Sequence, residues 1–87
     1  MLTIDQATAV MAKGVPVMFR GMHYLRIIGV SKVLTRRNDV VPSVAMEDRI
    51  GRTVYHGNPE EITMHGDVGD IHYYFVGDEL KAERVAQ

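Results

Sequence analysis

Two histidines and two carboxylates lie within eight residues in the last third of the chain, as His65, Asp67, Asp70 and His72. Imidazole and carboxylate groups are the ligand types that suit zinc, manganese or iron. The same run contains two glycines, as an ordinary acidic turn does, and it lacks the oxygen-ligand spacing of an EF-hand. We therefore expect no metal and no other cofactor, and a metal-dependent enzyme at these four residues is only our third functional hypothesis.

A second group of residues has the chemistry to hold phosphates and to stack bases. Arginine side chains beside aromatic rings on a sheet can do both. Part of the group flanks an expected hairpin, where cross-strand neighbours at equal distance from the turn can share a face. The plainer alternative is that these charges form only the solvated face of a sheet. The candidate nucleic-acid or phosphate-binding residues are Arg20, Tyr24, Arg26, Arg36, Arg37 and Arg52.

Acidic residues surround the aromatic side chains near the carboxy terminus, a combination that suits a protein-binding face. The net charge is only −1, but residues 13–52 carry eight bases against three acids, and residues 53–87 carry seven acids against two bases. The plainer alternative is a solvated edge strand with charged neighbours. The candidate protein-interface residues are Glu60, Glu61, Asp67, Asp70, Tyr74 and Asp78.

Catalytic signatures are missing from the sequence. It contains no P-loop, dinucleotide fingerprint, nucleophile elbow or paired metalloprotease histidines. Ser31 and Ser43 have no evident base beside them. We therefore nominate no catalytic residue and do not expect an enzyme.

The composition is that of one ordinary globular domain. The 87 residues are 46% hydrophobic and 24% charged, and they include no cysteine. A chain of this length holds one hydrophobic core, so we expect a single domain over residues 1–87. We expect no membrane association, because no apolar run is long enough to span a bilayer and the amino terminus lacks a signal-peptide pattern. The absence of cysteine agrees with a cytoplasmic location.

The amino-terminal segment predicts a helix over residues 4–13. Thr3 and Gln6 have the spacing of a capping box. Apolar residues follow at helical spacing, Gly14 stands where a left-handed C-terminal residue is wanted, and Pro16 prevents continuation.

Alternating residues predict an antiparallel sheet over about residues 15–76. Gly21-Met22 has the composition of a tight hairpin turn, and Gly29 interrupts the next strand where its apolar parity changes, which indicates a bulge or bend. After the last aromatic strand, residues 79–85 form either a short helix or a frayed tail. The expected fold is α+β, with one helix and a small curled antiparallel sheet of five or six strands, as in an SH3-like barrel. The alternative is an open sheet with the helix packed across one face.

The segments Gly14-Val-Pro-Val-Met-Phe-Arg-Gly21, Tyr24-Leu-Arg-Ile27 and Asn58-Pro-Glu-Glu-Ile62 carry a resemblance to known proteins. Together they resemble small uncharacterised proteins of phages and mobile elements from Gram-positive bacteria. The resemblance covers mainly the first third of the chain and transfers no functional residue. It implies an inhibitor of a host machine, of the anti-CRISPR or other anti-defence type.

Our first hypothesis is therefore a small non-catalytic protein that binds and modulates a host protein or nucleoprotein complex. The alternative is a nucleic-acid or nucleotide-binding domain that uses the basic hairpin face, with affinity that falls steeply with salt. A homodimer also stays open, because a short domain with edge strands can readily pair with a second copy.

Overall fold

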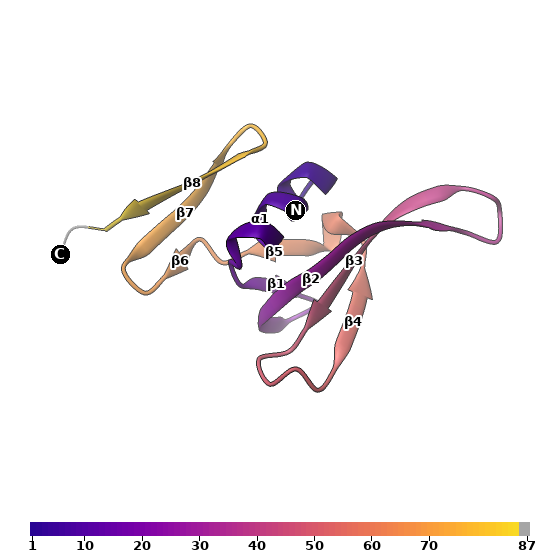
Figure 1. Ribbon diagram of the computed structural model, residues 1–87, viewed down its shortest axis with the longest axis horizontal. Helices are drawn as coiled ribbons and strands as arrows, with labels where there is room; N and C mark the ends of the chain where they lie inside the picture. The colour runs from indigo at the N-terminus through magenta and orange to yellow at the C-terminus, as the bar shows by residue number, and fades with distance from the viewer. Residues whose placement is uncertain (86–87) are drawn as a thin grey trace.

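The computed structural model describes residues 1–85 and has the predicted α+β fold (Figure 1). Residues 86 and 87, the end of the expected single domain, lie outside the described residues. In chain order the elements are α1 Ile4–Lys13, β1 Val17–Phe19, β2 Met22–Leu34, β3 Val40–Glu47, β4 Val54–Gly57, the single 3-10 turn η1 Pro59–Glu61, β5 Ile62–Met64, β6 Asp67–Val68, β7 Ile71–Val76 and β8 Glu79–Arg84.

Helix α1 begins and ends where its local sequence directs. The Thr3 hydroxyl accepts a hydrogen bond from the Gln6 amide at 3.1 Å, and the Gln6 side chain accepts one from the Thr3 amide at 3.0 Å. Gly14 has a φ of 70°, which glycine adopts without strain, and its amide donates to the carbonyls of Val10 and Met11. The predicted helix over residues 4–13 and its capping box are confirmed.

The strands form two antiparallel sheets, whereas we predicted one sheet of five or six strands. The larger sheet has the order β4-β3-β2-β1-β5, and the smaller has the order β6-β7-β8. Neither sheet closes on itself, so the described residues contain no closed barrel. The prediction undercounted the strands because β6 is only two residues long and β8 is rich in helix-forming residue types.

The carboxy-terminal segment is a strand, so the helix considered over residues 79–85 is wrong. Gly77, at a φ of 61°, turns the chain back so that Val76 pairs with Glu79 and Phe75 with Leu80. Leu80 packs against the core. Glu, Leu, Lys and Ala favour a helix in isolation, but pairing with β7 and burial of Leu80 override that weak preference.

The first hairpin turns at Arg20-Gly21, one residue earlier than predicted. Phe19 pairs with Met22, and the two loop residues have φ values of 49° and 79°, as a type I′ turn requires.

Farther along β2, Ile27 pairs with Met46 and Gly29 with Ala45, so Ile28 is the extra residue of a bulge. The irregularity predicted near Gly29 is confirmed.

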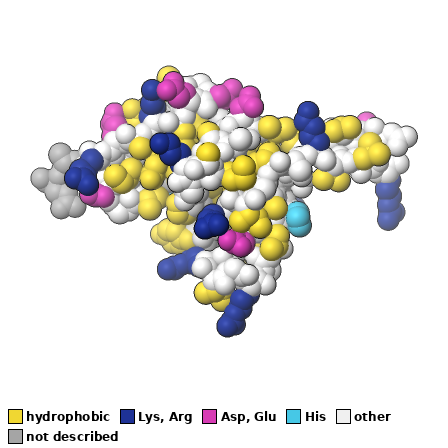
Figure 2. All heavy atoms as spheres, in the orientation of Figure 1, with side chains coloured by type: hydrophobic (Ala, Val, Ile, Leu, Met, Phe, Trp, Pro, Cys, Tyr) yellow, Lys and Arg dark blue, Asp and Glu magenta, His cyan; other side chains and the backbone are white. Residues whose placement is uncertain are grey.

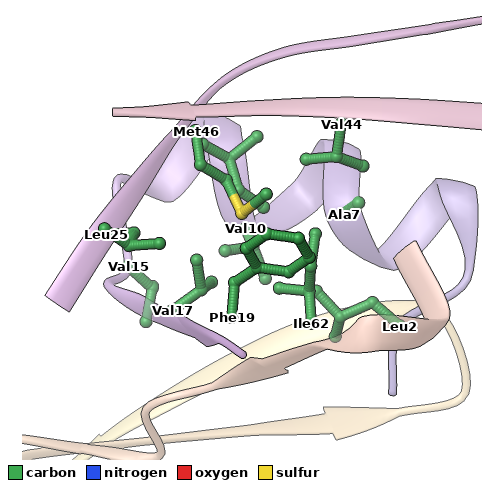
Figure 3. Packing of buried hydrophobic residues seen from close by; sticks show 11 residues of the cluster. Leu2, Ala7, Val10, Val15, Val17, Phe19, Leu25, Val44, Met46 and Ile62 are labelled. Atoms are coloured by element: carbon green, nitrogen blue, oxygen red, sulfur yellow. The ribbon is translucent and has the colours of Figure 1, made fainter. Parts of the chain in front are cut away.

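The core lies under the five-stranded sheet, between that sheet and α1 (Figure 3). Ala7 and Val10 of the helix are fully buried there. Gly57 on β4 lies so close to the Phe19 ring that there is no room for a Cβ. The buried apolar side chains are Leu2, Ala7, Val10, Val15, Val17, Phe19, Leu25, Ile27, Val44, Met46 and Ile62.

The three-stranded sheet is attached to the amino-terminal end of α1. The Gln6 side chain donates to the Gly77 carbonyl at 3.0 Å, and the Thr3 hydroxyl donates to Asp78 at 3.3 Å. Tyr73, Phe75 and Leu80 are partly buried against the core from this side. The helix thus connects the two sheets.

The β2–β3 hairpin extends beyond the body as a two-stranded ribbon, residues 31–43 (Figure 1). The molecule measures 52 × 31 × 20 Å along its principal axes. Its radius of gyration is 13.5 Å, against about 12 Å for a compact domain of this length. The excess reflects this projection and the β7–β8 hairpin at the other end (Figure 1).

Candidate binding surfaces

The ribbon carries apolar side chains beyond the point where the core can cover them. Val30 and Val44 pair across the strands at the edge of the core, and Leu34 and Val40 occupy the same face at the far end. Leu34 and Val40 are each 63% exposed. The face that packs inside the body therefore continues along the ribbon into solvent, with the register pair Lys32 and Pro42 between its two apolar pairs. Exposed apolar side chains of this kind are typical of an interaction surface.

The tip of the ribbon is a structured turn. The Thr35 hydroxyl accepts hydrogen bonds from the amides of Arg37 and Asp39 at 3.3 and 3.2 Å, and the Thr35 amide donates to the Asp39 carbonyl at 2.8 Å. Asn38 has a φ of 63°, a left-handed conformation that asparagine tolerates well. The tip therefore presents its side chains from a defined backbone.

Cations surround the exposed apolar pair. Lys32, Arg36 and Arg37 lie on or beside the ribbon tip, and none of them has a carboxylate partner within 4.0 Å in residues 1–85. Asp39 is the single acid of the ribbon. Figure 2 shows Lys or Arg side chains beside apolar side chains on this projection. The ribbon therefore combines an apolar stripe with a net positive charge.

The predicted basic face is not assembled as one surface. Arg36 and Arg37 are at the ribbon tip, whereas Arg52 is in the loop between β3 and β4. Arg20 is in the β1–β2 turn and forms an ion pair with Glu61 at 2.9 Å. Only Tyr24 and Arg26 lie together, in a shallow groove.

The Arg20 contact also changes the acid–base behaviour of its partner. The hydrogen bond from the Arg20 guanidinium holds the pKa of Glu61 below its ordinary value of 4.5, and the hydrogen bond from the Asn58 amide adds to the effect. Glu61 is therefore engaged within the chain as the capping residue of η1. It is less available to a partner than the sequence alone suggested.

The groove beside Tyr24 lies between the bulged start of β2 and the end of β3. It has a volume of about 540 Å³ and is open to solvent. Arg26 lies 3.7 Å from the Glu47 carboxylate within it. The Arg49 guanidinium carbon lies over the Tyr24 ring, 5.8 Å from the ring centre. The lining residues are Pro16, Tyr24, Leu25, Arg26, Glu47, Asp48 and Arg49.

The four candidate metal ligands do not converge. His72 bonds Asp67 at 2.8 Å, Asp70 lies 3.4 Å from Arg84, and His65 stacks on Tyr24. In residues 1–85 no group of three or more His, Asp or Glu side chains is placed to hold a metal ion. The acidic loop instead pairs its charges locally.

The predicted acidic interface is likewise divided among local contacts. Asp67, Asp70 and Asp78 engage His72, Arg84 and Thr3, respectively. The Tyr74 hydroxyl donates to Glu83 at 2.8 Å, and this bond raises the pKa of Tyr74 above its ordinary value of 10.0.

The outward face of the three-stranded sheet keeps its polar groups paired. The ion pair with Glu79 raises the pKa of Lys81 above 10.5. His72 stacks on Tyr74, with 5.7 Å between ring centres. Glu60 is exposed. The outward face of the three-stranded sheet is therefore solvated and has its polar groups paired. This is close to the alternative of a solvated edge strand with charged neighbours.

Several residues of these surfaces were not predicted as site residues. Arg49 and Glu47 join Tyr24 in the groove from β3 and the loop after it, and no local spacing signals that arrangement. His65 was predicted only as a possible metal ligand, and its stacking on Tyr24 was not predicted. The ribbon residues Leu34 and Val40 had a usable signal, because they flank a polar turn in a strand whose other apolar residues alternate. Exposure of that pair follows only from the length of the hairpin.

Comparison of the chain with protein-family models, curated proteins and solved structures finds no match. Within residues 1–85, α1 falls short of the length and apolar character that crossing a membrane requires.

Proposed function

We propose that this chain is a non-catalytic binding protein that docks its β2–β3 ribbon onto a partner protein. The observation that carries the proposal is the apolar pair Leu34 and Val40, each 63% exposed at the end of a projecting, structured ribbon. Two-stranded ribbons are marginally stable alone, and exposed apolar residues on them are costly unless a partner covers them. Burial in a complex supplies that cover.

The charges on the ribbon define the chemistry of the partner. Lys32, Arg36 and Arg37 surround the apolar pair and have no carboxylate partner among the described residues. Complementary potentials steer association and fix the register of an interface. The partner surface is therefore an apolar recess with an acidic rim.

A host protein is the first candidate for this partner. The resemblance of residues 14–21 and 24–27 to proteins of phages and mobile elements supports a chain that acts stoichiometrically on a host protein or nucleoprotein complex, in the cytoplasm. The anti-defence role is the specific form of this proposal.

The test is a comparative capture from nuclease-treated lysate of a Gram-positive host. The wild-type chain is compared with the double variant Leu34→Glu, Val40→Glu. The matched control is Val76→Glu, Val85→Glu, which makes the same charge change at two exposed apolar residues, one in β7 and one directly after β8. We expect one protein to be retained by the wild type and the control and lost by the ribbon variant. That protein, once purified, then binds in a 1:1 complex.

Two outcomes overturn the proposal. One is an unchanged set of captured proteins with the ribbon variant. The other is a stable oligomer of the pure wild-type chain, measured by light scattering, that the ribbon variant abolishes. In that case the ribbon is occupied by a second copy of the chain.

We further propose that the five-stranded sheet is an SH3-like barrel left open between β4 and β5. Pairing of β1 with both β2 and β5 supports this, because it brings the fifth strand back beside the first as the sheet curls. An experimental structure with a flat five-stranded sheet overturns it.

A further inference from the structure

Tyr24 has a backbone conformation that a bulky residue rarely adopts. Val17 pairs with Leu25 and Phe19 with Met22, so one residue of β1 faces two residues of β2 and the hairpin contains a bulge. Tyr24 stands in that bulge with a φ of 59°. Glycine is the usual residue in such a left-handed bulge position. Bulges re-aim side chains beside functional sites, and strained residues cluster there.

The strained backbone presents an aromatic ring that is supported from behind. The His65 imidazole lies parallel to the Tyr24 ring, with 4.6 Å between centres and 6° between planes. His65 Nε2 accepts a hydrogen bond from the Tyr24 amide at 3.4 Å. The His65 amide donates to the Pro16 carbonyl at 2.9 Å, which fixes the loop that carries the imidazole. Tyr24 is nevertheless 51% exposed.

The groove in front of this ring has mixed charge. Arg26 and Arg49 supply two cations, and Glu47 and Asp48 supply two carboxylates. Glu47 lies 3.7 Å from Arg26, too far for a hydrogen bond, so its carboxylate keeps acceptor capacity. Asp48 already accepts a hydrogen bond from the Arg52 amide through one oxygen. A matching ligand combines a flat apolar surface, hydrogen-bond donors and a negative charge.

We propose that this groove binds a nucleobase of a nucleotide. The base stacks on Tyr24. The Arg49 guanidinium carbon lies 5.8 Å from the Tyr24 ring centre in the free chain, too close for a base to fit between them, so Arg49 moves outward to cover the base. Aromatic rings and guanidinium planes are the surfaces on which unpaired bases stack. Glu47 accepts hydrogen bonds from amino and ring N–H groups of the base. Guanine is favoured because its adjacent N1–H and amino donors match the two oxygens of one carboxylate. Arg26 holds the phosphate.

This inference is independent of the ribbon. The two surfaces share no residue, and a nucleotide does not need the ribbon tip. The same base and phosphate groups would bind here whether the nucleotide is free or part of a single-stranded nucleic acid. The test therefore includes both a free nucleotide and a short single strand.

The test is a titration of the whole chain followed by amide chemical shifts in ¹H–¹⁵N spectra. The ligands are guanosine monophosphate, uridine monophosphate and a short single-stranded oligonucleotide that contains one guanine. We expect shifts centred on Tyr24, Arg26 and Glu47, with guanosine monophosphate bound more tightly than uridine monophosphate. Tighter binding of the oligonucleotide assigns the site to a single strand, and equal binding assigns it to the free nucleotide.

Variants separate a stacking role from a structural one. Tyr24→Gly removes the ring and suits the positive φ, so this variant keeps its fold while affinity falls about 5- to 150-fold, the usual range for loss of one base stack. Tyr24→Phe keeps the affinity. The matched control is Tyr74→Ala, which removes another tyrosine stacked on a histidine but outside the groove. Absence of shifts at millimolar ligand, or equal affinity of Tyr24→Gly and wild type, overturns the proposal.

Discussion

Leu34 and Val40 face each other in the last register pair of the β2–β3 ribbon, and both side chains remain 63% exposed. Burial of side chains of this size contributes roughly 1.5–3 kcal/mol each. The free protein gains little of this contribution, because the core ends several residues earlier. A partner that covers the pair gains most of it.

Replacing this pair should therefore separate stability from binding. We expect Leu34→Glu, Val40→Glu to lower the free energy of unfolding of the isolated chain by no more than about 1 kcal/mol, because the sites are exposed and the main cost is repulsion between two carboxylates placed opposite each other. Affinity for the partner should fall by about 100-fold or more, the equivalent of losing about 3 kcal/mol. Urea unfolding and titration calorimetry measure the two quantities. Large loss of stability in the free chain would show that the pair belongs to the core.

Gly57 should tolerate no side chain. A Cβ at this position overlaps the buried Phe19 ring, so we expect Gly57→Ala to lower the free energy of unfolding by about 1–3 kcal/mol, the usual cost of overpacking. Gly29→Ala is the matched control, because its Cβ would be 3.8 Å from Ala45, an ordinary contact. Urea denaturation gives both values.

The cause of the Gly57 effect can be isolated with a second substitution. In a Phe19→Leu background the smaller side chain leaves room, so Gly57→Ala should cost less there than in the wild type. An equal cost in both backgrounds would show that contact with the Phe19 ring is not the reason.

Glu61 should make stability depend on pH in the acid range. Its pKa is lowered in the folded chain by Arg20, so the unfolded chain takes up the proton first as pH falls. The stabilisation is present above pH 4.5 and is lost as pH falls through the lower folded-state pKa. The wild type should therefore differ in stability from Glu61→Gln at pH 7, and this difference should become smaller as the pH falls toward 3.

The neighbouring Glu60 provides the comparison for this pH series. Its side chain forms no ion pair among the described residues, so Glu60→Gln is the control that removes a neighbouring carboxylate and keeps the Arg20 contact. Chemical denaturation at each pH measures the difference in the free energy of unfolding between wild type and Glu61→Gln. A difference that stays constant from pH 7 to pH 3 would mean that the Arg20 contact is not formed in solution.

Gln6 should hold the β7–β8 turn to the helix. Its side chain donates to the Gly77 carbonyl at 3.0 Å, so Gln6→Ala should speed amide hydrogen exchange around residues 76–80. Thr8→Ala is the control, because that hydroxyl bonds only the Ile4 carbonyl of its own helix. Unchanged exchange in the Gln6 variant would indicate that the Thr3–Asp78 hydrogen bond and the packing of Leu80 hold the sheet in place without Gln6.

Local signals predicted the parts of this fold that depend on neighbouring residues. Thr3, Gln6 and Gly14 determine the helix through contacts within three or four residues, and the parity change at Gly29 marks the β2 bulge. The helix considered for the segment that forms β8, Glu79–Arg84, was wrong because this segment is a strand only through its pairing with β7. Residue propensity contains no information about that pairing.

The candidate surfaces were predicted less well, for the same physical reason. Tyr24 and Arg26 were selected as binding residues, and they do line one groove. The stacking of His65 on Tyr24 joins residues 41 positions apart, so no spacing rule indicates it. The separation of Arg36 and Arg37 from Arg52 follows from the 13-residue length of β2, which carries the tip away from the body.

The most direct test of ribbon docking is site-specific photo-crosslinking from the ribbon tip. A benzophenone amino acid replaces Leu34 in one chain and Val76 in a matched chain, since both residues are exposed and apolar. After irradiation in host lysate, we expect one defined protein adduct from position 34 and none of that mass from position 76. The same adduct from both positions, or none from position 34, would contradict docking through the ribbon.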